Sequence, residues 1–230
     1  MDTATLVSGI AIVDGARVLA EARHDASTRR ADLLVAIDEV SRRAGIPPSR
    51  LDAIAIGAGP GSFTGLRIGM ATAKGIAFAA GRPLWMVSSL AALAEDAARF
   101  LGSGPGDAGT VTAAVLDARR GEVFAGCFRG GASLAEERVM PPGELAAWIE
   151  QLAAGAPVQL AGDALAVHPI LEPLADRWLP VATPSGASVA WLALAGPRED
   201  VLAGGAPSYI RPSEAEVNYP DGVPGALRRR

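Results

Sequence analysis

A glycine-rich stretch, GAGPGSFTGLRIG at residues 57–69, is the feature that most constrains how this chain can fold. The apolar residues 51–56 that lead into it are typical of a buried strand. The alanine-rich residues 66–80 contain no proline and are followed by a glycine, which predicts a helix with a glycine C-cap. The stretch therefore predicts a strand, a tight glycine turn and a helix, with Ser62 or Thr64 as the helix N-cap.

Turns of this kind can bind phosphate on free backbone amides, so the known phosphate-binding motifs are compared first. A P-loop needs Gly-Lys-Ser/Thr at the helix start, but Gly65 is followed by Leu66 and Arg67. A dinucleotide fingerprint needs a third glycine where Thr64 stands, and an acidic residue about 20 positions on, where the next predicted strand ends in serines. Neither motif fits. Gly65 and Gly69 share one helix face, so the spacing favours the close approach of another backbone over a ligand loop.

Composition narrows the classes of protein further. The chain has 230 residues, half of them hydrophobic, which is typical of a globular protein with a substantial core. A net charge of −4 and a pI of about 5.3 argue against a protein that binds nucleic acid by itself. Cys127 is the only cysteine, which excludes an intramolecular disulfide and a thiolate metal cluster. Arg67 and Lys74 interrupt the apolar run after the turn too soon for a membrane span, and no signal peptide is evident. We expect a cytoplasmic protein with no membrane contact.

Read together, residues 59–69 resemble the signature of the TsaB family, bacterial accessory proteins of the tRNA threonylcarbamoyladenosine pathway that were once labelled glycoprotease homologues. Three further stretches match the family in order: residues 2–5 (DTAT), residues 116–124 (LDARRGEVF) and residues 207–211 (PSYIR). The resemblance covers nearly the whole chain. The signature residues are Gly59, Pro60, Gly61, Ser62, Phe63, Thr64, Gly65 and Arg67.

The resemblance implies an α/β protein with the duplicated actin/Hsp70-like (ASKHA) fold, in which two subdomains each have a mixed sheet flanked by helices. We expect an N-terminal subdomain over residues 1–103 and a C-terminal subdomain over residues 110–230, separated by a Gly/Pro-rich linker. Each subdomain of this superfold opens with a strand, an aspartate and a hairpin, and Asp2 and Asp117 occupy those places. Because the strand before Asp2 is missing, either the true start lies upstream or this copy is shortened and its sheet compromised. We expect the first, with about five mostly apolar residues upstream.

The residues give little support to catalysis. Nucleotide-using members of the superfold have glycine-rich turns after these aspartates, but here Ala4, Arg119 and Arg120 occupy the turns, so we expect no cofactor. The related enzyme TsaD places a metal on histidines after the corresponding central helix, where this chain has none. Its two histidines, His24 and His168, lie in opposite halves and are expected to be surface or loop residues. The sequence shows no Ser–His–Asp group either. Taken together, these observations lead us to expect no catalytic residue and no metal site.

The resemblance implies a non-catalytic partner subunit, or scaffold, required for tRNA N6-threonylcarbamoyladenosine modification. It is expected to bind and stabilise TsaD as a heterodimer, to work with the ATPase TsaE, and to meet tRNA only through the complex. Alone, it is expected to form a homodimer. The alternative is a stand-alone enzyme: an ASKHA-type ATP-dependent phosphotransferase or a glycoprotease-like peptidase.

A further predicted helix ends at Gly45 and carries Leu33, Ile37, Val40 and Ala44 on one stripe, whose simplest role is to cover a sheet. Because the family pairs homologous subunits through equivalent helices, we expect this helix and the helix after the glycine turn to form the partner surface. The alternative is that these positions face the protein's own sheet. The expected interface residues are Leu33, Ile37, Val40, Gly65, Leu66, Gly69, Met70, Ala73 and Ala77.

Overall fold

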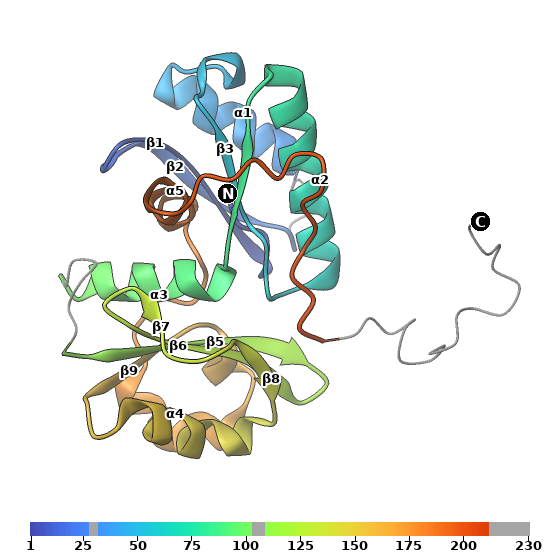
Figure 1. The fold of residues 1–230 in the computed structure, drawn as a ribbon. Coiled ribbons are helices and arrows are strands. Elements are labelled where there is room, and N and C mark those ends of the chain that lie inside the picture. The colour runs from blue at the N-terminus through green and yellow to red at the C-terminus, as the bar shows by residue number, and fades with distance from the viewer. Residues whose placement is uncertain (28–31, 103–108, 212–230) are drawn as a thin grey trace, which may run out of the picture.

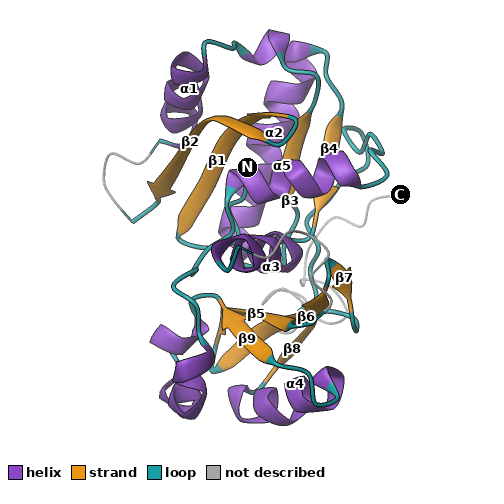
Figure 2. Cartoon of the chain, turned by 90° about the vertical axis from the view of Figure 1, so that its left-hand side faces the viewer, coloured by secondary structure: helices purple, strands orange, loops and turns teal. Residues whose placement is uncertain are grey.

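The chain forms two α/β halves stacked on each other in a computed structural model that describes residues 1–27, 32–102 and 109–211 (Figure 1). Helix α3 (Ser89–Phe100) lies between the halves (Figure 2). Most of the predicted linker falls outside the described residues. None of the helices in the described ranges combines the length and the apolar character that a membrane-spanning segment requires.

The glycine turn joins a strand to a helix, as predicted. Strand β3 (Ile54–Gly57) leads into the turn and helix α2 (Phe63–Ala80) leaves it. The helix ends at Gly81, whose φ of 63° is the left-handed conformation that glycine adopts at low cost. Strand β4 (Leu84–Val87) then lies parallel to β3, so the segment is a β–α–β unit.

The first half also contains a hairpin. Strands β1 (Val7–Asp14) and β2 (Arg17–Asp25) are antiparallel, and helix α1 (Leu33–Ala44) covers them. The apolar stripe of α1 does cover a sheet, because Val40 is fully buried in a cluster with hairpin residues. The hairpin and the β3–β4 pair form separate two-stranded sheets.

The first two residues lie between these two sheets. The Met1 amine donates to the Ala55 carbonyl over 2.8 Å, and the Gly57 amide donates to the Met1 carbonyl over 2.9 Å. On the other side, Asp2 and Gly9 exchange two backbone hydrogen bonds of 2.8 and 3.0 Å. Residues 1–2 therefore pair with both sheets, in the place of a central strand.

The second half is built on a five-stranded sheet in the order β7-β6-β5-β9, with β8 also paired to β6. Helix α4 (Leu145–Ala153) packs against one face of this sheet and α3 against the other. The strands are β5 (Val111–Arg119), β6 (Glu122–Arg129), β7 (Ala132–Ser133), β8 (Arg138–Met140) and β9 (Val158–Ala161). Short 3₁₀ turns occupy Pro48–Arg50, Pro142–Glu144, Ala164–Ala166 and Pro169–Arg177.

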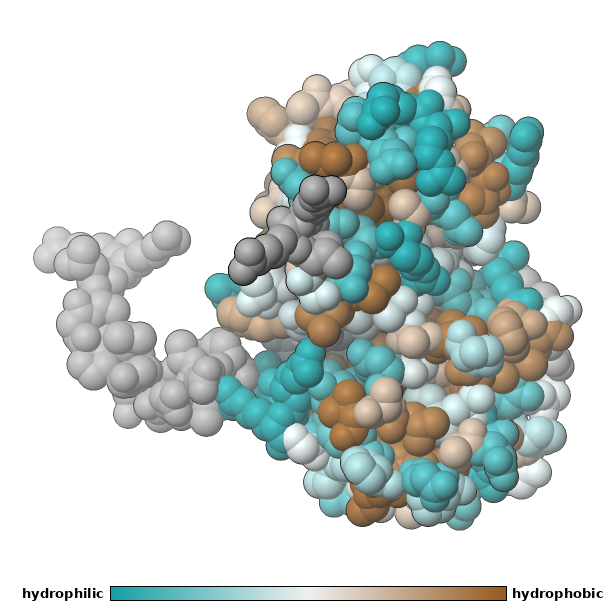
Figure 3. Space-filling view, turned by 180° about the vertical axis from the view of Figure 1, so that it is seen from behind, coloured by the Kyte–Doolittle hydropathy of each residue, from teal (hydrophilic) through white to brown (hydrophobic). Residues whose placement is uncertain are grey.

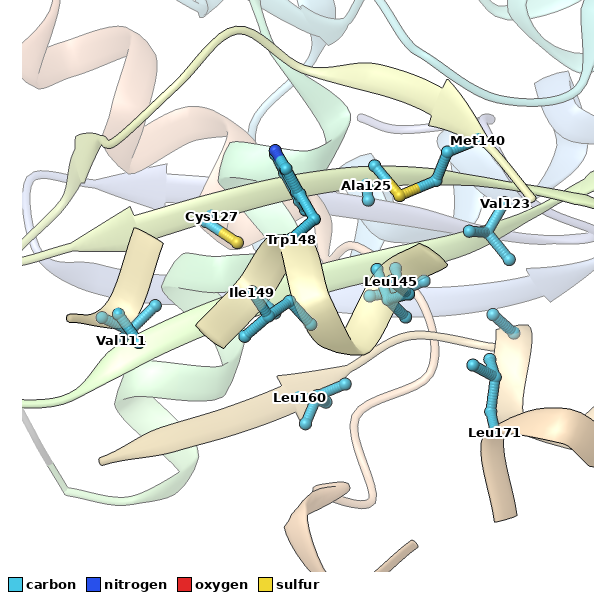
Figure 4. Close-up of a cluster of buried hydrophobic side chains, with 14 residues drawn as sticks. Val111, Val123, Ala125, Cys127, Met140, Leu145, Trp148, Ile149, Leu160 and Leu171 are labelled. Atoms are coloured by element: carbon cyan, nitrogen blue, oxygen red, sulfur yellow. The ribbon is translucent and has the colours of Figure 1, made fainter. Parts of the chain in front are cut away.

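The core under α4 explains why this half is stable. Leu145, Trp148 and Ile149 point from one stripe of the helix toward the sheet, where Cys127 of β6 and Leu160 of β9 meet them (Figure 4). These three residues lie at helical spacing, and Trp148 is a core residue. Each such side chain stabilises the fold by about 1.5–3 kcal/mol through removal from water.

The C-terminal part of the chain does not stay in the second half. Helix α5 (Gly186–Ala195) returns to pack on β1, β3 and β4, and the Val201 amide donates to the Leu84 carbonyl over 2.9 Å. The sequence places these residues in a C-terminal subdomain over residues 110–230, whereas in the folded chain α5 and the segment that follows it as far as Ser208 contact the first half. Sequence alone could not show this, because α5 is apolar on every side and does not identify its neighbour.

Candidate functional site

The glycine turn is held from several sides. Ser62 is the N-cap of α2, and its hydroxyl accepts a hydrogen bond from the Gly65 amide over 3.3 Å. Gly59 has a φ of 108°, its amide donates to the Ser89 hydroxyl over 3.1 Å, and its carbonyl accepts from the Ser89 amide over 2.8 Å. The Ala58 carbonyl accepts from the Ser208 amide over 2.7 Å, so the C-terminal segment also fixes the turn.

The glycines of the motif make room for the first residues of the same chain. A Cβ atom on Gly69 would lie 2.0 Å from the Thr3 hydroxyl oxygen, and one on Gly65 would lie 2.2 Å from the Thr3 carbonyl oxygen. A Cβ on Gly61 would lie 2.5 Å from Ala4. The Thr3 hydroxyl donates to the Gly65 carbonyl over 2.9 Å. Another backbone does approach this helix face closely, as the sequence predicts, and that backbone is the N-terminal segment of the same chain rather than a second subunit.

The other expected interface residues also face inward. Leu66, Met70, Ala73 and Ala77 are buried in the chain's own core, and so is Val40. Leu33 and Ile37 of α1 are partly buried against the same clusters. The buried positions among them face the protein's own sheets, which is the alternative that the sequence left open, whereas Leu33 and Ile37 stay partly exposed.

A cleft of about 500 Å³ opens in front of the turn, between the two halves. Its walls are residues 4–6, residues 60–64, the turn between β5 and β6, and residues 208–211. At its mouth the Arg67 guanidinium lies 3.8 Å from the centroid of the Phe63 ring, and its Nε donates to the Tyr209 hydroxyl over 3.1 Å. Two signature residues thus clamp the C-terminal segment onto α2.

A buried histidine–carboxylate pair lies behind the cleft. His168 Nε2 is 3.0 Å from Asp117 Oδ1, and both side chains are less than a tenth exposed. The Asp117 amide donates to Asp163 Oδ1 over 2.8 Å, and burial raises the pKa of Asp163. Of the two places expected for His168, surface or loop, the structure gives the loop, where the side chain is buried beside Asp117. Residues 51 positions apart in sequence carry no signal of such contact.

The matching family model and the named relatives are both described as proteins of tRNA threonylcarbamoyladenosine formation. A family model described as TsaD, tRNA N6-adenosine threonylcarbamoyltransferase, matches residues 24–177. The chain is 29% identical to the tRNA threonylcarbamoyladenosine biosynthesis protein TsaB of Bacillus subtilis over 95% of this chain and 96% of that protein. It is 34% identical to the TsaB of Escherichia coli over 54% of this chain and 51% of that protein. The chain belongs to the TsaB family.

A solved structure from Pseudomonas aeruginosa supports the same assignment. That protein, described as uncharacterised with similarity to peptidase YeaZ, is 30% identical, with a TM-score of 0.73 over 91% of this chain and 97% of its own. The family resemblance drawn from residues 59–69 is therefore confirmed. In the folded chain these residues form the turn between β3 and α2, together with the start of that helix.

The surface that this member of the family leaves open on α2 lies opposite the buried stripe. Ile68 is 51% exposed and Phe78 is 79% exposed. Gly75 lies on the same side, and a Cβ atom placed there would meet nothing within 4 Å. On α1, Leu34 and Val35 are 57% and 58% exposed. We call Ile68, Gly75 and Phe78 of α2 the outer helix face.

The sequence does not predict the outer helix face. Helix α2 carries only two charged residues, Arg67 and Lys74, so its pattern does not show which side is exposed to water. Exposed apolar side chains also occur elsewhere on the molecule. Figure 3 shows the molecule from behind, with hydrophobic patches on both halves separated by hydrophilic ones. Among the described residues, no group of three or more His, Cys, Asp or Glu side chains gathers in a way that could hold a metal ion.

Proposed function

We propose that this protein acts in tRNA N6-threonylcarbamoyladenosine formation as a non-catalytic subunit that binds and stabilises TsaD. The ATPase TsaE works with that pair, and tRNA contacts the protein only within the complex. The relatives named for this pathway support the assignment. The observation that carries the scaffold role is the outer helix face, since apolar side chains gathered on one exposed side mark a protein–protein contact more often than scattered ones do.

We infer that the outer helix face is the partner surface, in place of the buried stripe. Ile68, Gly75 and Phe78 lie on one side of α2 at helical spacing. The open space above Gly75 lets a second helix approach closely, and the flanking apolar side chains can then pack around it. Without TsaD, the same face pairs with its copy in a second chain, which gives an isologous homodimer.

A similarity between the two halves of the chain supports the duplicated actin-like fold. Asp2 Oδ1 accepts from the Ala4 amide over 2.8 Å, and Asp117 Oδ1 accepts from the Arg119 amide over 3.0 Å. The two aspartates therefore close the same turn, each two residues before its donor, at the start of each half. We infer two copies of one unit, whose first copy supplies the partner helices.

The test is binding of purified TsaD, measured by isothermal titration calorimetry. Phe78→Glu and Ile68→Glu would each place an unpaired charge in a desolvated interface and should weaken binding at least about 30-fold. Phe100→Glu is the matched control, because Phe100 is 57% exposed at the end of α3. Far-UV circular dichroism should be unchanged in all three variants. Full affinity in both α2 variants would refute the partner surface, and no binding of TsaD by the unmodified protein would refute the function.

A second candidate is the stand-alone enzyme, either an ATP-dependent phosphotransferase or a peptidase. The observation in its favour is the pair of His168 and Asp117 near the cleft, which has the arrangement of a base and the group that orients it. It predicts that the purified chain hydrolyses ATP or peptides and that His168→Gln abolishes turnover. We expect no turnover in the unmodified protein, since Ala4, Arg119 and Arg120 occupy the turns where phosphate would bind.

A further inference from the structure

The last described residues of the chain cross the front of the cleft between the two halves. Residues 208–211, which we call the C-terminal strap, line the cleft together with residues 60–64 of the first half and residues 116–120 of the second. In Figure 1 the segment that ends in the strap descends beside α2 from the first half to the level of the second. The strap therefore connects the two walls of the cleft.

The beginning of the strap is held firmly on the first half. The Ser208 amide donates to the Ala58 carbonyl over 2.7 Å. The Tyr209 ring centroid lies 5.3 Å from that of Phe63, and the Tyr209 hydroxyl accepts a hydrogen bond from Arg67 over 3.1 Å. A backbone hydrogen bond and a group of stacked side chains thus fix this end on the glycine turn and α2.

The end of the strap is held on the second half by weaker contacts. Arg211 Nη1 lies 3.1 Å from Glu122 Oε2 at the start of β6, and the two side chains are 26% and 35% exposed. The Arg211 guanidinium also lies 6.0 Å from the centroid of the Phe124 ring, at the outer limit of a cation–π contact. Ion pairs exposed to this degree contribute little, because water and salt screen them. This anchor can therefore break while the rest of the fold stays intact.

Helix α3 joins the halves much more strongly, behind the cleft. Leu90, Leu93 and Ala97 of this helix are fully buried in an apolar cluster with residues of β5 and β6. The Ser89 hydroxyl at the start of the same helix donates to Asp2 Oδ2 over 2.6 Å, which fixes α3 to the first half as well. Helix α3 is therefore a joint that persists as long as the protein is folded, whereas the strap is a tie across the open side.

We propose that the C-terminal strap is a releasable clasp. In the closed form it bridges the two walls of the cleft, with Arg211 on Glu122. In the open form its end leaves Glu122, the partly buried Ile210 leaves the edge of the apolar cluster, and the halves pivot about α3 so that the cleft widens. The clasp then controls how large a molecule the cleft admits. This inference does not rest on the proposed function.

Proteolysis of the native protein measures release of the strap. Chymotrypsin cleaves after aromatic residues, and the bond between Tyr209 and Ile210 lies within the strap. When opening and closing are fast, the cleavage rate follows the population of the open form. Glu122→Ala should raise this rate about two- to fivefold, and Arg211→Ala about three- to tenfold, because the second change also removes the contact with Phe124. Each rate is divided by that of a peptide with the same local sequence, since Arg211 lies two residues after the cleaved bond.

Two matched variants serve as controls. The charge swap Glu122→Arg with Arg211→Glu keeps an ion pair at this place, so it should return the rate to within about twofold of the unmodified chain. Asp38→Ala removes an exposed ion pair with Arg42 within α1, far from the strap in sequence, and should not change the rate.

A distance measurement shows whether the halves move when the strap is released. Spin labels are placed on Glu21→Cys in β2 and Glu150→Cys in α4, both of which are exposed, while the buried Cys127 stays unlabelled. Labelled chains are diluted with unlabelled ones, so that pulsed electron resonance reports distances within one molecule. Glu122→Ala should add a population with a changed distance between the labels, and the charge swap should remove it.

Three results would overturn the proposal. Unchanged cleavage in both Glu122→Ala and Arg211→Ala would show that the ion pair does not hold the strap. Cleavage that rises only in proportion to global unfolding, measured by labelling of Cys127, would show that the strap does not open separately. Faster cleavage with unchanged distances between the labels would show that the strap does not tie the halves.

Discussion

Gly69→Ala gives the sharpest check of how the signature motif works. The added Cβ would lie 2.0 Å from the Thr3 hydroxyl oxygen and 3.0 Å from two Thr3 carbons, in a place where Thr3 is 3% exposed. Overpacking of this kind costs about 1–3 kcal/mol, and displacing the Thr3 hydroxyl from the Gly65 carbonyl costs about 1 kcal/mol more. The helix gains about 1 kcal/mol from alanine, which leaves a net loss of about 2 kcal/mol.

The same substitution six residues later should have the opposite sign. A Cβ at Gly75 meets nothing, so Gly75→Ala should stabilise α2 by about 0.5–1 kcal/mol through helix propensity alone. Thermal unfolding followed by circular dichroism should show a fall in Tm of about 4–8 °C for Gly69→Ala and a rise of about 1–4 °C for Gly75→Ala.

A second change identifies the contact. Thr3→Ala removes the hydroxyl and the methyl group that the new Cβ would meet, so the double variant with Gly69→Ala should lose less stability than the sum of the single variants, by about 1–2 kcal/mol. If Gly69→Ala leaves the Tm unchanged and weakens TsaD binding instead, the packing argument fails and the glycine face is a partner surface.

Three further outcomes follow from the packing and the charges. Burial lowers the pKa of the Met1 amine from 8.0 to about 6, so the unfolded chain binds more protons between these values. The free energy of unfolding should therefore rise by roughly 2 kcal/mol from pH 6 to pH 8, and the difference between free and N-acetylated chains in urea titrations at each pH measures this rise. Burial raises the pKa of the Cys127 thiol to about 12, so Ellman's reagent should label it only as fast as the chain unfolds; rapid labelling of the native protein would contradict its burial. Asp96 accepts hydrogen bonds from the Ser185 amide and hydroxyl and from the Ser188 hydroxyl, so Asp96→Ala should cost about 2–3 kcal/mol of unfolding free energy in urea, whereas the exposed control Asp38→Ala should cost less than about 0.5 kcal/mol.

The hydrogen bonds and packing within single segments could be predicted from the sequence. The apolar run, the glycines and the capping serine of residues 51–81 predict a strand, a turn and a helix, because strand period, cap chemistry and left-handed glycine are properties of neighbouring residues. The same holds for the apolar stripe of α1, which ends before Gly45 and covers a sheet. The motif also identified the family.

Which surfaces meet was decided only by the tertiary structure. The sequence shows that Gly65 and Gly69 admit a close neighbour, but not that the neighbour is Thr3, more than 60 residues away. Helix α2 is apolar on nearly all sides, so its outer face was identified only once β3, β4 and the N-terminal segment covered the rest. The approach of His168 to Asp117 depends likewise on folding of the whole second half. Local propensity specifies each element, whereas the burial of one element against another depends on contacts between distant residues, which the sequence pattern of a single element does not contain.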